Sequence, residues 1–495
     1  MKTGDSRVRR ATFGAMRILF VSSEVEPYSK TGGLGDVLGA LPKAMAARGH
    51  ECLVVSPRYG SIDIAKHQLT PSGKTISVSF PFGRQDAPVL LAPEKEKNLK
   101  LAFLEHHGFF GGRKGIYGDD GDYSDNHRRF AFLSRGAFEV CRAMDFTPDV
   151  VHVHDWHTGL APLYLHELRG DRRFANARSV FTIHNLGYQG VFGKNAMFDL
   201  GLDWRYFTVE GLEFHDAVNF LKCGLAFSDA ITTVSRRYAE EIQAPDSGWG
   251  LDGALRARRH KLFGILNGVD YEEWNPAADK LIPAMYSRQS PLGKQRCHQW
   301  IVDTFNLELS PKTLVLGMVT RLAYQKGAEL VLQGSAGIFG RDVALVMLGN
   351  GDAAEEHGFR QLEQFYPGRC GAYIGFSREL SHKVIAGVDA LLMPSRYEPC
   401  GLTQMYALRY GTLPIVRATG GLDDTVVDAA QPEGTGFKFG PFSPEALVHA
   451  VWRAADLFEN RSAWMELAVR GMEKDFSWDS SSRQYQELFA RLAHH

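Results

Sequence analysis

The stretch RILFVSSEVEPYSKTGGLGDVLGALPKAMAARGHECLVVSP, residues 17–57, decides the fold class. It begins and ends with short apolar runs of the kind that form buried strands. Between them, from Leu34 onward, apolar residues recur every three to four positions, which is the period of a helix. A glycine-rich turn separates the first run from this segment. The pattern therefore predicts a βαβ unit of a parallel sheet.

The same alternation continues along the chain in two blocks. Short apolar runs recur in DVVHVHDWHTG and ARSVFTIHN, and they start afresh after residue 276 with TLVLGMV, VALVMLG, VDALLMP and GTLPIVR. We therefore expect an α/β protein with two Rossmann-like, doubly wound domains that face each other across a deep cleft. We assign residues 16–262 to the first domain and 263–477 to the second. An amphipathic helix over 478–495 is expected to pack back on the first domain.

The composition excludes several classes of protein. Of the 495 residues 44% are hydrophobic, and 56 Lys and Arg stand against 57 Asp and Glu, so the formal net charge is -1. A chain without a basic excess attracts neither nucleic acid nor an anionic membrane. The six cysteines form no C-x-x-C pair, and no apolar run approaches the ~20 residues of a membrane span. We expect a cytoplasmic protein, with residues 1–15 forming an extension or tag that is disordered and outside the fold.

The turn KTGGLGDV lies where a strand leads into a helix. Gly32 and Gly33 allow the backbone to approach a ligand, and the free N–H groups of the following helix favour an anion. Lys30 adds a mobile positive charge. The alternative is a turn that uses glycine for structural reasons alone. The pattern matches neither G-x-G-x-x-G nor G-x-x-x-x-G-K-[ST], which disfavours a nicotinamide dehydrogenase and a P-loop NTPase.

The second block carries two further anion-binding candidates. Arg321 and Lys326 follow a strand in TRLAYQKG, where they fit a diphosphate, although a solvated pair in a loop is the alternative. In YEPCGLTQ, the turn at Glu398 leads into a helix that we expect to open at Gly401, with its free amides at residues 401–403. Glu398 either faces sugar hydroxyls or is a capping charge of this helix.

Polar and aromatic side chains collect after two strands of the first block. HVHDWHTG and TIHNLGYQG bring His, Asp, Asn, Trp and Tyr to the ends of these strands, which suits a carbohydrate pocket. A metal site is the alternative for the histidine-rich HVHDWH, but no second ligand motif accompanies it.

Six motifs in the same order resemble the bacterial glycogen synthases and the related plant starch synthases: KTGGLGDV, HVHDWHTG, HNLGYQG, RLAYQKG, YEPCGLTQMYALRYG and TGGLDDTV. The resemblance extends from Met16 to the C-terminus. It implies the GT-B fold and the retaining transfer of glucose from ADP-glucose to the non-reducing end of glycogen or another α-1,4-glucan. It also implies that no metal and no cofactor take part.

The resemblance also implies roles for particular residues. His184, Glu398, Arg321 and Lys326 would be catalytic. The donor would be bound by Lys30, Gly33, Arg321, Lys326, Phe376, Gly401, Leu402 and Thr403. The sugar and the acceptor would be bound by Asp155, Trp156, Asn185, Tyr188 and Asn267. At Phe376 the chain departs from the family, which often has a tyrosine stacked on adenine there.

Three alternatives remain open on the sequence. A GT-B transferase that uses UDP-glucose, or forms sucrose or trehalose, would share the architecture. A glucan phosphorylase would as well, but it needs pyridoxal phosphate on a lysine, for which the sequence has no motif. A catalytically silent glucan-binding protein would not need the cationic residues of a phosphate clamp.

Overall fold

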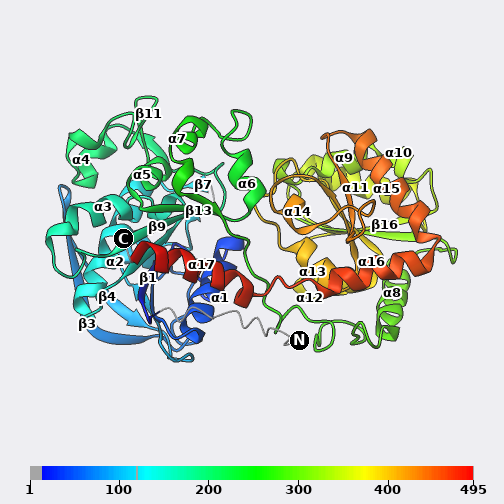
Figure 1. The fold of residues 1–495 in the computed structure, drawn as a ribbon, viewed down its shortest axis with the longest axis horizontal. Coiled ribbons are helices and arrows are strands. Elements are labelled where there is room, and N and C mark those ends of the chain that lie inside the picture. Colours follow the sequence, from blue (N-terminus) through cyan, green and yellow to red (C-terminus); the bar gives the residue numbers. More distant parts are fainter. Residues whose placement is uncertain (1–13, 119–120, 494–495) are drawn as a thin grey trace, which may run out of the picture. The chain divides into compact units, whose positions relative to one another are not determined.

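The computed structural model describes residues 14–118 and 121–493 and divides the chain into two compact units (Figure 1). The first unit comprises the chain up to Thr232, Pro245–Phe263, and the chain from Ser482 on. The second comprises Thr233–Ala244 and Gly264–Ser481. Residues 1–13, most of the expected N-terminal extension, lie outside the described residues.

A nine-stranded sheet forms the centre of the first unit, in the order β14-β13-β9-β8-β1-β2-β5-β4-β3. Its strands are β1 (Arg17–Val21), β2 (Glu51–Pro57), β3 (Thr70–Phe80), β4 (Gly83–Leu91), β5 (Leu99–Leu104), β8 (Val150–His154), β9 (Arg178–Ile183), β13 (Ala230–Thr233) and β14 (Leu262–Gly264). The strands β5, β2, β1, β8 and β9 run parallel, whereas β3 and β4 form an antiparallel hairpin at one edge. The chain order reverses between β1 and β8, and such a switch point is where open α/β sheets bind ligands.

Helices flank this sheet because each has one apolar face. In α1 (Gly33–Ala47), the buried side chains recur at helical spacing, among them Val37, Leu38, Leu41 and Met45. The other helices of six or more residues that start in this unit are α2 (Asn126–Ala143), α3 (Ala161–Glu167), α5 (Phe220–Phe227) and α7 (Asp252–Ala257). A small sheet of β10 (Val191–Gly193), β12 (Ala217–Asn219) and β11 (Glu213–Phe214) follows β9 in the chain.

The second unit has a six-stranded sheet in the order β17-β16-β15-β18-β19-β20. Its strands are β15 (Leu314–Val319), β16 (Val343–Gly349), β17 (Cys370–Ile374), β18 (Ala390–Met393), β19 (Leu413–Arg417) and β20 (Phe437–Phe439). All neighbouring pairs are parallel. Numbered along the chain this is the 3-2-1-4-5-6 order of dinucleotide-binding folds, with the switch point between β15 and β18. The expected pair of Rossmann-like domains is therefore confirmed.

Helices surround this second sheet as well. They are α8 (Leu292–Thr304), α9 (Ala328–Gln333), α10 (Ser335–Ile338), α11 (Ala353–Phe365), α12 (Arg378–Gly387), α13 (Thr403–Arg409), α14 (Gly420–Thr425), α15 (Pro444–Phe458) and α16 (Arg461–Glu473). Lys294 of α8 fastens two of them. Its ammonium donates to the carbonyl oxygens of Ala386 and Val388 at the end of α12, and to that of Tyr410 at the end of α13. Cations at helix C-termini are stabilising because the unpaired carbonyl groups there carry partial negative charge.

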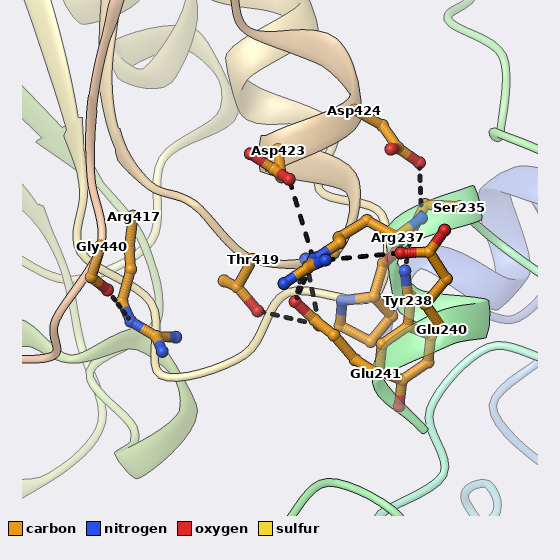
Figure 2. Close-up of polar contacts among 12 residues, drawn as sticks. Ser235, Arg237, Tyr238, Glu240, Glu241, Arg417, Thr419, Asp423, Asp424 and Gly440 are labelled. Carbon is orange, nitrogen blue, oxygen red and sulfur yellow. Dashed lines mark hydrogen bonds and ion pairs between the residues drawn. The ribbon is translucent and has the colours of Figure 1, made fainter. Parts of the chain in front are cut away.

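The segment Thr233–Ala244 belongs to the second unit, whereas the sequence predicts that all of 16–262 belongs to the first domain. This segment contains α6 (Arg236–Glu241), which packs against α14 of the second unit (Figure 2). The carboxylate of Glu241 accepts hydrogen bonds from the Thr419 hydroxyl and the Gly420 amide, and the Arg237 amide donates to Asp424. These polar contacts join α6 to the second unit, although its neighbours in the chain belong to the first.

The C-terminal helix α17 (Trp478–Ala493) belongs to the first unit from Ser482 on. The rings of Tyr485 and Phe489 are buried, and both lie against the ring of His152 in β8 at centroid distances of 5.3 and 5.5 Å. Arg48, at the end of α1, donates to the Ser482 hydroxyl. Among the described residues, no helix combines the length and the apolar character needed to cross a membrane.

Candidate active site

The KTGG turn follows β1 at the switch point of the first unit. A buried carboxylate, Glu24, holds the turn in place, because it accepts a hydrogen bond from the Thr31 amide at 2.8 Å and another from the Thr31 hydroxyl. Burial raises the pKa of Glu24, and the hydrogen bonds from Thr31 act in the opposite direction. The sequence analysis missed this residue. The available signal was an acidic residue directly after a buried strand and shortly before a glycine turn.

The two glycines of this turn leave space around the start of α1. A Cβ atom added to Gly32 or to Gly33 would meet no atom within 4 Å, so packing within the protein does not require glycine at either position. Gly33 is the first residue of α1, and its amide is among those without a partner inside the helix. The ammonium of Lys30 is partly exposed and pairs with Asp36 in the first turn of α1. The turn is thus open to a ligand, with a cation beside it.

Asp155 lies at the other side of the same switch point, directly after β8. Its backbone has a positive φ of 55°, which is uncommon for a residue other than glycine. Its carboxylate accepts hydrogen bonds from the backbone amides of His184, at 2.7 Å, and Asn185. Burial raises the pKa of Asp155 to about 7, and the nearby Glu24 carboxylate acts in the same direction. Asp155 therefore couples the loop after β8 to the loop after β9, as the parallel pairing of these strands allows.

The expected sugar-binding residues of the first unit differ in exposure. His184 is partly buried, and burial lowers its pKa to about 3, so its ring is neutral. Tyr188 is 57% exposed and available to a ligand. Trp156, in contrast, is only 4% exposed, and a Cβ on Gly190 would meet its ring at 2.3 Å. The Trp156 ring therefore packs beneath the loop that carries Tyr188, and its assignment to the acceptor stays a prediction.

The switch point of the second unit brings two expected catalytic residues into direct contact. The Lys326 ammonium lies 2.7 Å from the Glu398 carboxylate, which also accepts a hydrogen bond from the Ser395 hydroxyl at 3.0 Å. Glu398 is buried and Lys326 largely so. Arg321 lies in the same loop after β15 and is exposed. An exposed guanidinium and a fixed ammonium in one loop are suitable groups for binding a phosphate.

The turn after Glu398 is built by close backbone contacts from the TGGLDDTV motif. A Cβ on Gly420 would meet the Glu398 carbonyl oxygen at 1.9 Å, and one on Gly421 would meet that of Cys400 at the same distance. The Gly421 amide donates to the Glu398 carbonyl oxygen at 3.0 Å. These contacts explain why two adjacent glycines are needed there. Gln404, another residue that the sequence analysis missed, donates its amide hydrogens to the Cys400 and Gly401 carbonyl oxygens.

The helix after this turn begins later than expected. Gly401 has a φ of +69°, Leu402 is the N-cap, and the first helical residue is Thr403, so the opening at Gly401 is corrected by two residues. Two residues from distant parts of the chain also reach this turn. The Ser235 hydroxyl donates to the Pro399 carbonyl oxygen at 2.6 Å, and the Asn267 backbone is hydrogen-bonded to the Cys400 thiol.

Phe376 follows β17 at the same edge of the sheet, since β17, β16 and β15 are parallel. Its ring is 84% exposed, which leaves a face available for stacking. Within residues 14–118 and 121–493, no group of three His, Cys, Asp or Glu side chains is arranged to hold a metal ion.

Comparison with known proteins identifies the family. Residues 17–257 match the family described as starch synthase catalytic domain, and residues 303–468 match glycosyl transferases group 1. A glycogen synthase from Myxococcus xanthus (strain DK1622) is 51% identical over 479 residues, which make up 96% of this chain and 99% of the relative. The chain belongs to the glycogen synthase family. The resemblance carried by the six motifs is thus confirmed.

Other relatives agree with this assignment. A glycogen synthase from Anaeromyxobacter sp. (strain Fw109-5) is 49% identical, with 97% of this chain and 100% of the relative covered. The catalytic domain of starch synthase IV from Arabidopsis thaliana, bound to ADP and acarbose, superposes with a TM-score of 0.88 at 30% identity, covering 97% of this chain and 100% of that one. As a member of the glycogen synthase family, this chain is a glycosyltransferase with the GT-B fold.

Proposed function

We propose that this enzyme transfers glucose from ADP-glucose to the non-reducing end of an α-1,4-glucan such as glycogen, with retention of the anomeric configuration. The observation that carries the proposal is the contact between Lys326 and Glu398 at the switch point of a nucleotide-binding sheet. Support for the donor and the acceptor comes from relatives: the Arabidopsis starch synthase is bound to ADP and acarbose, and the bacterial relatives are glycogen synthases.

We assign the donor phosphates to the second unit. The bond between the anomeric carbon and the diphosphate breaks during transfer, so negative charge grows on the leaving phosphate oxygen. Lys326 and Arg321 supply positive charge, and the amides of Gly401–Thr403 supply hydrogen-bond donors. Groups held in position before the reaction stabilise such charge most strongly. The ion pair with Glu398 holds the Lys326 ammonium in position.

We assign the glucosyl group mainly to His184 and Glu398, with Asp155, Asn185 and Asn267 binding sugar hydroxyls. Lys30 and Gly33 are proposed donor contacts of the KTGG turn, Phe376 is proposed to stack on the adenine, and Tyr188 is proposed to meet the acceptor. The Asp155 carboxylate supports this role of its loop, because it fixes the backbone of His184 and Asn185.

Retention is proposed to occur by attack of the acceptor hydroxyl on the same face that the diphosphate leaves. The departing phosphate oxygen takes the proton of that hydroxyl, so no protein base is needed. Glu398 is an alternative nucleophile for double displacement. Its engagement with both Lys326 and Ser395 favours a role in positioning the ammonium.

The test is the release of nucleoside diphosphate from ADP-glucose and from UDP-glucose, each with and without glycogen. We expect glycogen-dependent release of ADP, together with lengthening of the glucan. A preference for UDP-glucose would overturn the donor assignment, and glucan binding without release would identify a silent binding protein. Phosphorolysis of glycogen, with the visible absorbance of pyridoxal phosphate, would identify a phosphorylase.

A further inference from the structure

Two histidine rings are in direct contact beneath the loops of the first unit. His154 is the last residue of β8, and His184 directly follows the neighbouring parallel strand β9. The Nδ1 atom of His154 lies 3.0 Å from the Nε2 atom of His184, which is a hydrogen-bond distance. Since neither atom can donate without a proton, one of the two rings must supply it.

Both rings are neutral, so each carries a single N–H. Burial lowers the pKa of His184 to about 3 and that of His154 well below its usual range, and the neighbouring rings of His152 and His184 act in the same direction on His154. The His154 side chain is fully buried, and among the described residues its other nitrogen, Nε2, has no hydrogen-bond partner. The position of the proton on His154 therefore decides whether that buried nitrogen is an N–H group or a bare lone pair.

The two arrangements differ in cost. If His184 donates, His154 must carry its own proton on Nε2, and a buried N–H is left without an acceptor. If His154 donates from Nδ1, its Nε2 is a bare acceptor. Buried N–H groups without a partner are the rarer of the two cases in proteins, because their full desolvation penalty remains uncompensated. The second arrangement is favoured on this ground.

A neighbouring histidine has the same arrangement independently. The Nδ1 atom of His152 is buried and lacks a partner among the described residues, whereas its Nε2 lies 2.6 Å from the Thr182 hydroxyl. The Thr182 hydroxyl in turn lies 2.6 Å from that of Thr232. By the same reasoning, His152 donates from Nε2 and keeps a bare Nδ1. Both histidines of β8 thus use their single N–H in a hydrogen bond and bury the nitrogen that lacks one.

We propose that His154 is a positioning residue that donates its Nδ1 hydrogen to His184 Nε2 and so makes His184 carry its own proton on Nδ1. His184 then offers an N–H donor, not a lone pair, from the ring nitrogen that His154 does not occupy. Such a donor matches an oxygen lone pair of a sugar hydroxyl. This consequence for catalysis rests on the proposed function, whereas the protonation state of His184 does not.

Two substitutions at one position separate this role from packing. Asparagine in His154→Asn retains an N–H donor near the position of Nδ1, whereas leucine in His154→Leu fills a similar volume without any donor. We expect His154→Leu to lower kcat/KM about tenfold, the effect of one neutral hydrogen bond. His154→Asn is expected to stay within about threefold of the wild type, on the same scale.

Nitrogen NMR of the free enzyme labelled with ¹⁵N-histidine tests the proposal directly, with His184→Gln used to assign the His184 signals. We expect the wild type and His154→Asn to carry the His184 proton on Nδ1, with Nε2 accepting a hydrogen bond. In His154→Leu we expect that hydrogen bond to be lost, which moves the His184 Nε2 signal toward that of a free lone pair. A wild-type proton on Nε2, or an unchanged spectrum in His154→Leu, would overturn the proposal. If the leucine variant does not fold, the wild type and His154→Asn decide the matter. These spectra need no substrate, so a failure of the ADP-glucose assay would overturn the proposed function separately.

Discussion

Replacing Gly33 by alanine separates the two roles that a glycine can have in the KTGG turn. The added Cβ would meet no protein atom within 4 Å, and residue 33 has ordinary helical geometry at the start of α1. A Gly→Ala change at such a position stabilises a protein by about 0.4–1 kcal/mol, because the unfolded chain loses freedom. For a unit of this size we expect Tm to rise by about 1–3 °C.

The same methyl group is expected to impair catalysis if the donor lies where we propose. A ligand phosphate at the first turn of α1 would accept a hydrogen bond from the backbone, and a charge-assisted bond of this kind contributes about 1.5–3 kcal/mol. Loss of one such bond lowers kcat/KM by roughly 10- to 100-fold. Initial rates of ADP release over a range of ADP-glucose concentrations measure this effect, and thermal unfolding measures stability.

Gly39 offers a matched control on the same helix. A Cβ there would meet the Cβ of Glu26 at 2.9 Å and its carbonyl oxygen at 3.0 Å. Overpacking of this kind costs about 1–3 kcal/mol. We therefore expect Gly39→Ala to lower Tm while kcat/KM stays near that of the wild type. Wild-type kcat/KM in Gly33→Ala would refute the proposed donor contact, and a fall in its Tm would show that the glycine has a structural role.

Three further predictions concern charged groups. Lys326→Ala removes the proposed phosphate ligand and should lower kcat about a hundredfold, which corresponds to about 3 kcal/mol of activation free energy. Lys383→Ala removes a lysine that is paired with a glutamate on α12, and it should leave kcat unchanged. Equal rates in the two variants would contradict the assignment. The pKa of Asp155 is raised from an ordinary 3.8 to about 7 in the folded state. As the pH rises, the Asp155 carboxyl group therefore loses its proton in the unfolded chain at a lower pH than in the folded one. The wild type should therefore lose stability relative to Asp155→Asn as the pH rises from about 4 to 7, and parallel unfolding curves would disprove this. Burial lowers the pKa of Lys294 to about 8, and the hydrogen bonds of its ammonium should stabilise the second unit. The free energy of unfolding of Lys294→Met is therefore expected to be about 2–4 kcal/mol lower than that of the wild type. An unchanged denaturation midpoint would contradict this.

The sequence predicted the order of strands and helices well, for a local reason. In α1 the apolar residues Val37, Leu38, Leu41 and Met45 recur at the helical period, and all are buried in the structure. Buried parallel strands likewise appear as continuous apolar runs, such as residues 314–319. The position of Lys326 after such a strand was therefore readable without coordinates.

The functional residues were harder to predict where burial decides their role. Trp156 and Tyr188 both looked like aromatic surfaces for a glucan, but the first is packed beneath Gly190 and only the second is exposed. Glu24 escaped notice because it belongs to none of the quoted motifs, and Gln404 because nothing in its motif indicates a role for its side chain. Each acts by accepting or donating hydrogen bonds at the backbone of a turn.

Residue order alone was enough to establish two Rossmann-like domains and the family, because strand and helix periodicity and the six motifs are properties of neighbouring residues. Which groups meet is a different matter. Glu398 lies 72 positions from Lys326, and the Pro399 carbonyl oxygen lies 164 positions from the Ser235 hydroxyl that donates to it. Such contacts, and the membership of Thr233–Ala244 in the second unit, arise only when distant strand ends and helices pack together. A hydrogen bond depends on distance in space, and periodicity along a chain does not contain that distance.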